Sequence, residues 1–195
     1  MINTVFTKEY RLPDIDTNEV LRYAGVKELN ESIRSLIDDC KKEVGDISGK
    51  VCWAIFPVRV NSGKVELPFR TIHSKDLSKN LEGCDSVIVF GATIGLNVDR
   101  KIAKYSIVSQ SRAVILQAIY AERIEALCDL FCGDMGNSYT LKPRFSPGYG
   151  DVELSLQGDL IKVLDSAKKI GLTVNKSMVL SPSKSVTAFV GVRGK

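Results

Sequence analysis

The sequence predicts an α+β domain. Segments typical of strands and helices are interspersed along the chain, without the regular strand–helix–strand alternation of a doubly wound parallel sheet. The strongest strand signal is the apolar run at residues 85–90, and the strongest helix signal covers residues 97–132. A length of 195 residues suits one domain with an ample core, so we expect residues 1–195 to form a single unit with residues 1–13 as an N-terminal arm.

The N-terminal quarter is expected to contain this arm and two helices. Residues 1–16 read as extended chain that ends in a loop. Asp16 and Thr17 are typical of a helix N-terminus, and Gly25 is typical of the end of the short helix that follows. A longer helix is predicted over residues 28–44, where apolar side chains recur at helical spacing.

The next part of the chain is expected to form strands and one short helix. Residues 51–60 are apolar and β-rich, which predicts a buried strand. After a turn at residues 61–63, residues 65–72 are expected to pair back as a hairpin. A short helix over residues 74–81 then precedes the strand at residues 85–90.

The predicted spine of the domain is the helix at residues 97–132. Its central part, residues 113–121, is apolar on nearly every side, which indicates a buried helix. We expect it to end at residues 133–136. A later helix is predicted over residues 154–170, with Gly171 at its end. Three short strands are expected at residues 172–174, 178–180 and 186–192.

Composition and charge exclude several classes of protein. Lys and Arg number 27 against 23 Asp and Glu, and the resulting charge of +4 is too small to indicate a nucleic-acid partner. No apolar stretch is long enough to span a bilayer, and the first residues do not resemble a signal peptide. The five cysteines have no paired spacing, so we expect reduced thiols in a cytoplasmic protein.

Two local patterns suggest chemistry but have simpler interpretations. Residues 91–95, Gly-Ala-Thr-Ile-Gly, lie between a predicted strand and helix, but their spacing fits neither a dinucleotide fingerprint nor a P-loop. A compact turn is therefore favoured over a phosphate site. Cys128 and Cys132 lie one helical turn apart, but two thiols do not complete a metal site, and His73 is the only histidine. We therefore expect no metal site, and we do not expect His73 to act as a general base, because no serine or cysteine nucleophile motif lies near it.

Acidic residues lie on one face of the long predicted helix. Glu122, Glu125 and Asp129 are spaced by three and then four residues. The simplest interpretation is a solvated stripe. Because the helix is mostly apolar upstream, a half-buried acid facing a ligand is the alternative.

The segment from Arg144 to Asp151 is the most unusual in the chain. Pro147 within it and Pro143 just before it restrict the backbone, and its glycines permit conformations that other residues avoid. Irregular backbone exposes N–H and C=O groups that can bind the edge of an adenine. Arg144 offers a planar fork for a carboxylate or phosphate, and Tyr149 offers a ring face and a hydroxyl. The alternative is a well-packed turn with a surface arginine.

Residues 144–149, Arg-Phe-Ser-Pro-Gly-Tyr, resemble the Arg-x-x-Pro-Gly-Tyr motif of the activation domain of cobalamin-dependent methionine synthase, which binds S-adenosylmethionine. The similarity extends over about residues 14–192. It includes residues 55–60 with Phe-Pro-x-Arg-Val, Glu125 on the long helix, and the Pro-Ser-Lys-Ser-Val segment at residues 182–186. The resemblance implies a single domain with a mainly antiparallel, twisted sheet and long helices.

The resemblance also implies a ligand-binding site. Its residues are Asp16, Glu125, Arg144, Pro147, Gly148, Tyr149 and Asp151. Arg144 suits the α-carboxylate, Asp16 and Glu125 suit the ammonium or the ribose hydroxyls, and the backbone of residues 147–151 suits the adenine. Two departures stand out: Ser138 replaces an acidic residue of the family, and the sequence ends at Lys195, before the family's C-terminal extension with a further ligand tyrosine.

The implied function is reactivation. S-adenosylmethionine supplies a methyl group, and a flavodoxin-like donor supplies an electron, so that inactive cob(II)alamin returns to methylcobalamin. The cobalamin itself would be carried by a separate methionine synthase subunit, on which this chain acts in trans. The resemblance thus implies a positional role, with no catalytic residue in this chain. The alternative is a non-enzymatic S-adenosylmethionine-binding or protein-interaction module. A Rossmann-type methyltransferase is disfavoured because the glycine-rich fingerprint is absent.

Overall fold

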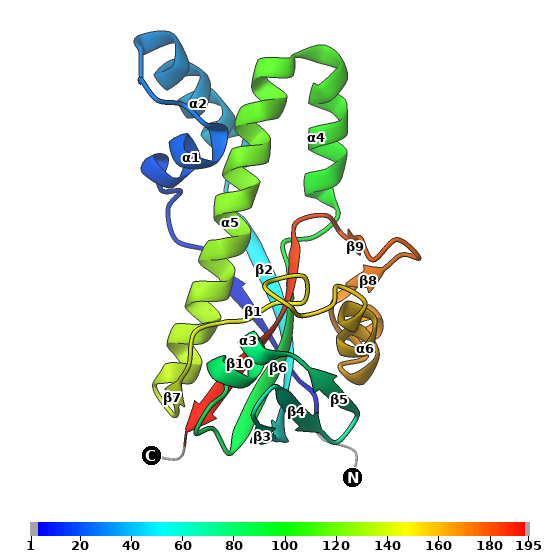
Figure 1. The fold of residues 1–195 in the computed structure, drawn as a ribbon. Coiled ribbons are helices and arrows are strands. Elements are labelled where there is room, and N and C mark those ends of the chain that lie inside the picture. Colours follow the sequence, from blue (N-terminus) through cyan, green and yellow to red (C-terminus); the bar gives the residue numbers. More distant parts are fainter. Residues whose placement is uncertain (1–3, 194–195) are drawn as a thin grey trace.

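The computed structural model of the chain describes residues 4–193. Figure 1 shows a sheet crossed by one long helix, with shorter helices on either side. The helices are α1 (Thr17–Ala24), α2 (Glu31–Val44), α3 (Lys75–Asn80), α4 (Asn97–Val108), α5 (Gln110–Gly136), α6 (Leu156–Val163) and α7 (Ser166–Ile170). The strands are β1 (Phe6–Arg11), β2 (Ser48–Pro57), β3 (Arg59–Asn61), β4 (Lys64–Leu67), β5 (Arg70–His73), β6 (Ser86–Thr93), β7 (Thr140–Leu141), β8 (Thr173–Val174), β9 (Leu180–Ser181) and β10 (Ser185–Arg193).

The main sheet has five strands in the order β1–β2–β6–β10–β7, and every neighbouring pair is antiparallel. Two smaller sheets, β3–β4–β5 and β8–β9, are also antiparallel. The predicted α+β class with a mainly antiparallel sheet and long helices is therefore confirmed. Neighbouring strands of the main sheet are joined by long connections, such as the one that contains α1 and α2 between β1 and β2, whereas β3, β4 and β5 follow one another through tight turns.

Each face of the main sheet has its own hydrophobic core, because successive side chains of a strand point to opposite faces. On one face, Phe90 of β6 packs in a cluster with Leu127 and Phe131 of α5. On the other face, Val89 of β6 belongs to a cluster that includes Leu160 of α6. The predicted burial of the long helix is confirmed, since α5 contributes twelve buried residues.

Residues 97–132 are helical almost throughout, as predicted, but they form two helices, α4 and the greater part of α5. The break falls at Ser109, whose backbone is extended with φ −160° and ψ 101°. Its Oγ accepts a hydrogen bond from the backbone N–H of Arg112 at 3.5 Å and caps α5. Figure 1 shows the result, a hairpin of α4 and α5. A serine that bonds local backbone competes with the helix, and apolar periodicity does not reveal this.

Three other predicted elements are also divided. The expected strand at residues 51–60 is interrupted at Val58, between β2 and β3. The expected helix at residues 154–170 breaks at Asp165, which has a left-handed φ of 46°, into α6 and α7. The expected strand at residues 65–72 breaks at Pro68 into β4 and β5, because proline has no N–H to donate to a ladder. β4 and β5 pair with each other, and β3 rather than β2 is the hairpin partner of β4.

The predicted N-terminal arm lies partly outside the described residues, at positions 1–3. Within it, Phe6–Arg11 forms β1, an edge strand whose register on β2 runs from Phe6 opposite Trp53 to Arg11 opposite Ser48. Residues 194–195 of the predicted domain also lie outside the described part. β7 was not anticipated from the sequence.

The five cysteines are free thiols, as predicted. Cys132 is partly exposed and the other four are buried. Burial raises the pKa of the Cys52 thiol to about 12, so this group stays protonated at neutral pH. None of the helices within residues 4–193 combines the length and the apolar character that crossing a membrane requires.

Candidate functional site

A cavity of about 710 Å³ lies where α5, α6, β9, β10 and the segment at residues 143–149 meet. Its lining residues come from these five elements: Glu125, Pro143, Arg144, Phe145, Ser146, Pro147, Tyr149, Gln157, Leu180, Ser185, Val186 and Thr187. Four of the seven residues predicted to bind the ligand are among them, namely Glu125, Arg144, Pro147 and Tyr149. The structure therefore brings the long helix and the proline-glycine segment together around one space.

The cavity exists because the chain leaves the sheet edge after Phe145. This residue forms an isolated bridge to Phe189 of β10, with backbone hydrogen bonds of 2.9 and 2.8 Å in the two directions. The chain then turns at Pro147 and Gly148, where the N–H of Tyr149 donates to the carbonyl of Ser146 at 3.2 Å. Gly148 has a φ of 89°, so proline followed by this glycine has the pattern of a type II turn.

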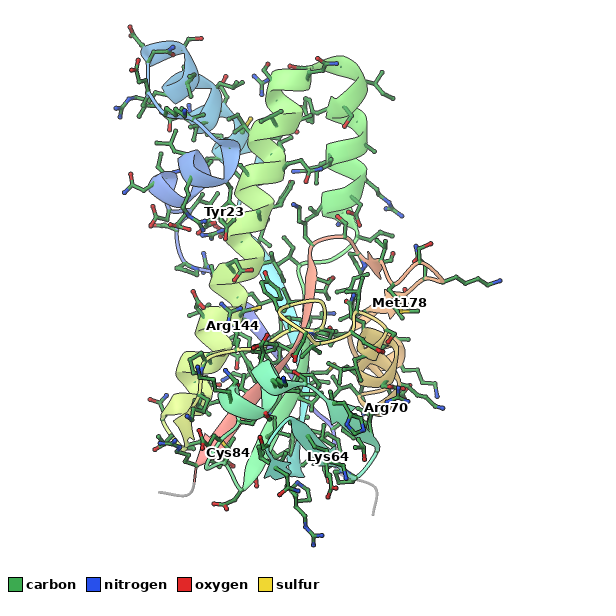
Figure 2. The ribbon with its side chains drawn as sticks, in the orientation of Figure 1. Tyr23, Lys64, Arg70, Cys84, Arg144 and Met178 are labelled. Atoms are coloured by element: carbon green, nitrogen blue, oxygen red, sulfur yellow. The ribbon has the colours of Figure 1, made fainter. Side chains whose placement is uncertain are left out.

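Arg144 is the cationic group of the site, and Figure 2 shows it beside α5. Its Nη2 donates to Glu125 Oε2 at 3.0 Å and to Asp129 Oδ1 at 2.8 Å. The two carboxylates lie one helical turn apart on α5. Among residues 4–193, both hydrogen-bond partners of the guanidinium use Nη2, which leaves Nη1 and Nε available to a ligand. Two carboxylates against one guanidinium leave an excess of negative charge, which suits a ligand that carries positive charge as well as a carboxylate.

The predicted acidic stripe is divided between two environments. Glu122 is 5% exposed and is paired with Arg123 beside it, which also donates to the backbone carbonyls of Pro13 and Asp14. Glu125, whose side chain is 42% exposed, lies half-buried at the cavity. The Glu122–Arg123 pair therefore fixes the loop that leads into α1, and Glu125 is available to a ligand.

Asp16 lies outside the residues that line the cavity. Its carboxylate caps α1, with Oδ1 accepting from the N–H groups of Asn18 at 2.8 Å and Glu19 at 3.5 Å. Its own N–H donates to Glu122 Oε1 at 3.4 Å. Since Glu122 and Glu125 are neighbours on α5, the Asp16 loop is held close to the helix that carries the cavity wall.

Asp151 anchors the outer end of the loop rather than lining the cavity. Its carboxylate accepts hydrogen bonds from the Ser74 hydroxyl and from the N–H groups of Lys75 at 2.7 Å and Asp76 at 3.3 Å, so it caps α3. The hydrogen bond from Ser74 is the main cause that lowers the pKa of Asp151 below its ordinary value. In return, Asp76 Oδ2 accepts from the N–H of Asp151 at 3.2 Å.

Gly150 is required by the same contact. A Cβ at this position would lie 2.2 Å from Asp76 Oδ2, and the backbone has a positive φ of 52°. Gly148 and Gly150 are thus shape-determining residues of the loop. Together with Asp151, they hold Pro147 and Tyr149 at the cavity, where Tyr149 remains 69% exposed.

Sequence reasoning did not single out the opposite wall of the cavity. Gln157, Leu180 and Thr187 were not considered as binding residues, and Ser185 and Val186 entered only as part of a resembling segment. Gln157 is 7% exposed, and its Nε2 donates to the carbonyl of Met178 at 3.0 Å. A signal was present in β10, where Ser185 and Thr187 are polar residues two apart in an otherwise apolar strand.

The glycine-containing segment at residues 91–95 forms a tight turn after β6. The N–H of Gly95 donates to Thr93 Oγ1 at 3.2 Å, and Gly95 has a φ of 86°. A second cavity of about 500 Å³ lies beside it, lined by charges of both signs, including Lys50, Lys101 and Glu9. This arrangement agrees with a compact turn and gives no selective preference for a phosphate.

Comparison with known proteins identifies a fold but no sequence family. No protein-family model matches the chain, and no curated protein matches it. Among solved structures, the crystal structure of the MetH reactivation domain bound to AdoHcy (S-adenosylhomocysteine) matches with a TM-score of 0.70. The match covers 95% of this chain and 78% of that chain at 14% sequence identity. The chain therefore has the fold of the MetH reactivation domain, which confirms the fold that the resemblance implied.

Proposed function

We propose that this chain binds S-adenosylmethionine in the 710 Å³ cavity and acts in trans to reactivate a cobalamin-dependent methionine synthase. One observation carries the proposal. The segment predicted to bind the ligand lines a cavity and is paired there with Glu125, in a fold shared with a domain whose solved structure holds S-adenosylhomocysteine. Charge, shape and fold thus favour the same ligand class.

The residues present fit the chemical groups of this ligand. Nη1 and Nε of Arg144 suit its α-carboxylate, because a guanidinium binds a carboxylate in a planar fork. Glu125 and Asp129 suit the ammonium and the sulfonium, whose positive charges balance the excess of negative charge at this wall. Tyr149 offers an exposed ring on which the adenine can stack. The backbone at Pro147 and Gly148 supplies polar groups beside that ring.

Asp16 and Asp151 have different places in this proposal. Asp151 caps α3 and so maintains the shape of the loop rather than touching the ligand. Asp16 lies next to Glu122 on the α5 side. It contacts the ammonium or ribose end of the ligand when its side chain turns away from the α1 cap.

The chain's contribution to reactivation is positional. The methyl group of a sulfonium is already electrophilic, and cobalamin on the partner supplies the nucleophile. Holding donor and acceptor in line can remove several kcal/mol from the barrier, up to roughly 7–11 kcal/mol in well-oriented intramolecular reactions. The described residues of the site orient the methyl donor and shield it from water. A flavodoxin-like protein is the proposed source of the electron.

The test has two stages. Calorimetry of the isolated chain with S-adenosylmethionine and with S-adenosylhomocysteine measures binding, and absence of binding to both overturns the proposal. The chain is then mixed with a reductant and a cobalamin-loaded methionine synthase that lacks its activation domain. Methylcobalamin, detected by its absorption spectrum, is expected to form only when the chain and S-adenosylmethionine are both present.

A control separates reactivation from ordinary methyl transfer. The isolated chain, given S-adenosylmethionine and homocysteine without a cobalamin partner, is expected to show no turnover. Robust turnover in that mixture would contradict the reactivation role. Ligand binding without any effect on the partner's cobalamin would instead support the alternative, a non-enzymatic binding module.

A further inference from the structure

The edge of β10 is open at the cavity. Beside it, the backbone of Phe189 pairs with Phe145 in both directions, and the carbonyl of Gly191 accepts from the N–H of Lys142 at 2.9 Å. The backbone polar groups of alternate residues in a strand point to the same edge. The backbone N–H and C=O of Thr187 therefore point to the edge at which Phe189 pairs with Phe145. The segment that contains Phe145 has already turned away from this edge at Pro147. No residue between 4 and 193 pairs with the Thr187 backbone on that edge.

Among residues 4–193, the side chain of Thr187 also lacks a hydrogen-bond partner. Thr187 is 2% exposed and lines the cavity, and within residues 4–193 its Oγ1 is one of two enclosed side-chain oxygen or nitrogen atoms that lack a hydrogen bond. An unpaired buried hydroxyl destabilises a folded chain. Its neighbour on the same strand differs, because Ser185 Oγ is hydrogen-bonded to Thr93 Oγ1 at 2.8 Å. Within the described residues, the backbone N–H, the backbone C=O and the hydroxyl of Thr187 thus all lack a hydrogen-bond partner beside the cavity.

We infer that Thr187 is a specificity-determining residue of the cavity, whose free backbone N–H and C=O bind the amino-substituted edge of the adenine while its hydroxyl bonds to the same nucleoside. The inference rests on the proposed function. Adenine carries a ring nitrogen acceptor next to an exocyclic amino donor. A residue on a free strand edge presents the complementary pair, a donor next to an acceptor. The ring then lies between β10 and the exposed face of Tyr149.

The hydroxyl is tested by Thr187→Val, which keeps the shape and removes the polar atom. Affinity for S-adenosylhomocysteine, measured by calorimetry, is expected to fall about five- to tenfold. The melting temperature of the ligand-free variant is expected to stay level or rise, because an unsatisfied buried group has been removed. Thr93→Val is the matched control. Its hydroxyl has partners in Gly95 and Ser185, so its removal should lower the melting temperature.

The backbone is tested by amide hydrogen exchange, followed by NMR on the whole chain with and without S-adenosylhomocysteine. The Thr187 amide is expected to become at least tenfold more protected when the ligand binds. The Phe189 amide, which already donates to Phe145, is the internal reference and should change much less. S-inosylhomocysteine has N1–H and a carbonyl where adenine has N1 and the amino group, so donor and acceptor are reversed on the Watson–Crick edge. If the base binds through that edge, this analogue should give no protection of the Thr187 amide.

The outcomes distinguish this inference from the proposed function. If S-adenosylhomocysteine does not bind, both are overturned. If it binds, but Thr187→Val retains full affinity and the Thr187 amide gains no protection, the function stands and the role of Thr187 is wrong. A fall in melting temperature for Thr187→Val as large as that for Thr93→Val, with unchanged affinity, would show that the hydroxyl is merely structural.

Discussion

The guanidinium of Arg144 lies 3.0 Å from the carboxylate of Glu125, although 19 positions separate the two residues in the sequence. The contact joins an irregular segment to the central helix at the wall of a cavity. Ion pairs between partly exposed groups contribute only about 0–1 kcal/mol to stability. The contact between Arg144 and Glu125 is therefore important for position, because it holds the guanidinium where Nη1 and Nε remain available to a ligand.

Replacing Arg144 with alanine is expected to weaken S-adenosylmethionine binding about 10- to 100-fold. The reason is loss of a charge-assisted hydrogen-bonded pair, which contributes about 1.5–3 kcal/mol. Arg144→Lys should recover only part of the affinity, because an ammonium cannot reproduce the planar fork. Calorimetry measures the affinities, and Arg59→Ala, on β3, is the control. Unchanged affinity in Arg144→Ala would mean that this arginine has only a structural role.

Gly150→Ala is expected to destabilise the chain by about 1–3 kcal/mol. The new Cβ would lie 2.2 Å from Asp76 Oδ2, and moving that carboxylate breaks its hydrogen bond with the N–H of Asp151. Gly158→Ala is the matched control, since it lies in α6 with nothing within 4 Å of the new Cβ, and it should stabilise by about 0.5–1 kcal/mol. Equal urea midpoints for the two variants would rule out the close contact at Gly150.

The Asp151 cap predicts a dependence of stability on pH. The pKa of this carboxyl is below its ordinary value of 3.8 in the folded chain, so its stabilising effect is complete above that value. The effect is lost as the pH falls through the lower, folded-state pKa. Asp151→Asn should therefore lower the melting temperature at pH 7 and differ less from the wild type below about pH 3. Asp38→Asn, on the exposed side of α2, is the control for the loss of one surface negative charge.

The buried pair of Glu122 and Arg123 gives a prediction about stability. Arg123→Met leaves the Glu122 carboxylate enclosed without its partner, which should cost about 3–5 kcal/mol. The double variant Glu122→Gln with Arg123→Met should recover part of this loss. Arg22→Met removes an exposed ion pair to Glu19 and should change the unfolding free energy by less than about 1 kcal/mol. An Arg123→Met variant as stable as Arg22→Met, by urea unfolding, would contradict this account.

Much of the fold was predictable because its signals are local. The apolar surface of α5 predicted a buried helix, and the apolar run in β6 predicted a strand. The breaks at Ser109 and Asp165 were missed, because apolar periodicity continues across them while backbone conformation changes. β7 was missed because it is two residues long and is defined by its partner β10 rather than by its own sequence.

The chemistry of the loop is encoded locally, in its own residues. Pro147 followed by Gly148 favours a type II turn through allowed backbone angles alone, and Arg144 carries its charge in any fold. Which groups meet at the cavity depends instead on how the whole chain folds. Glu125 lines it, Asp151 instead caps α3, and Thr187 is left with an unpaired hydroxyl. The physical reason is that pairing and burial depend on neighbours distant in sequence, here the point at which the chain leaves the edge of β10.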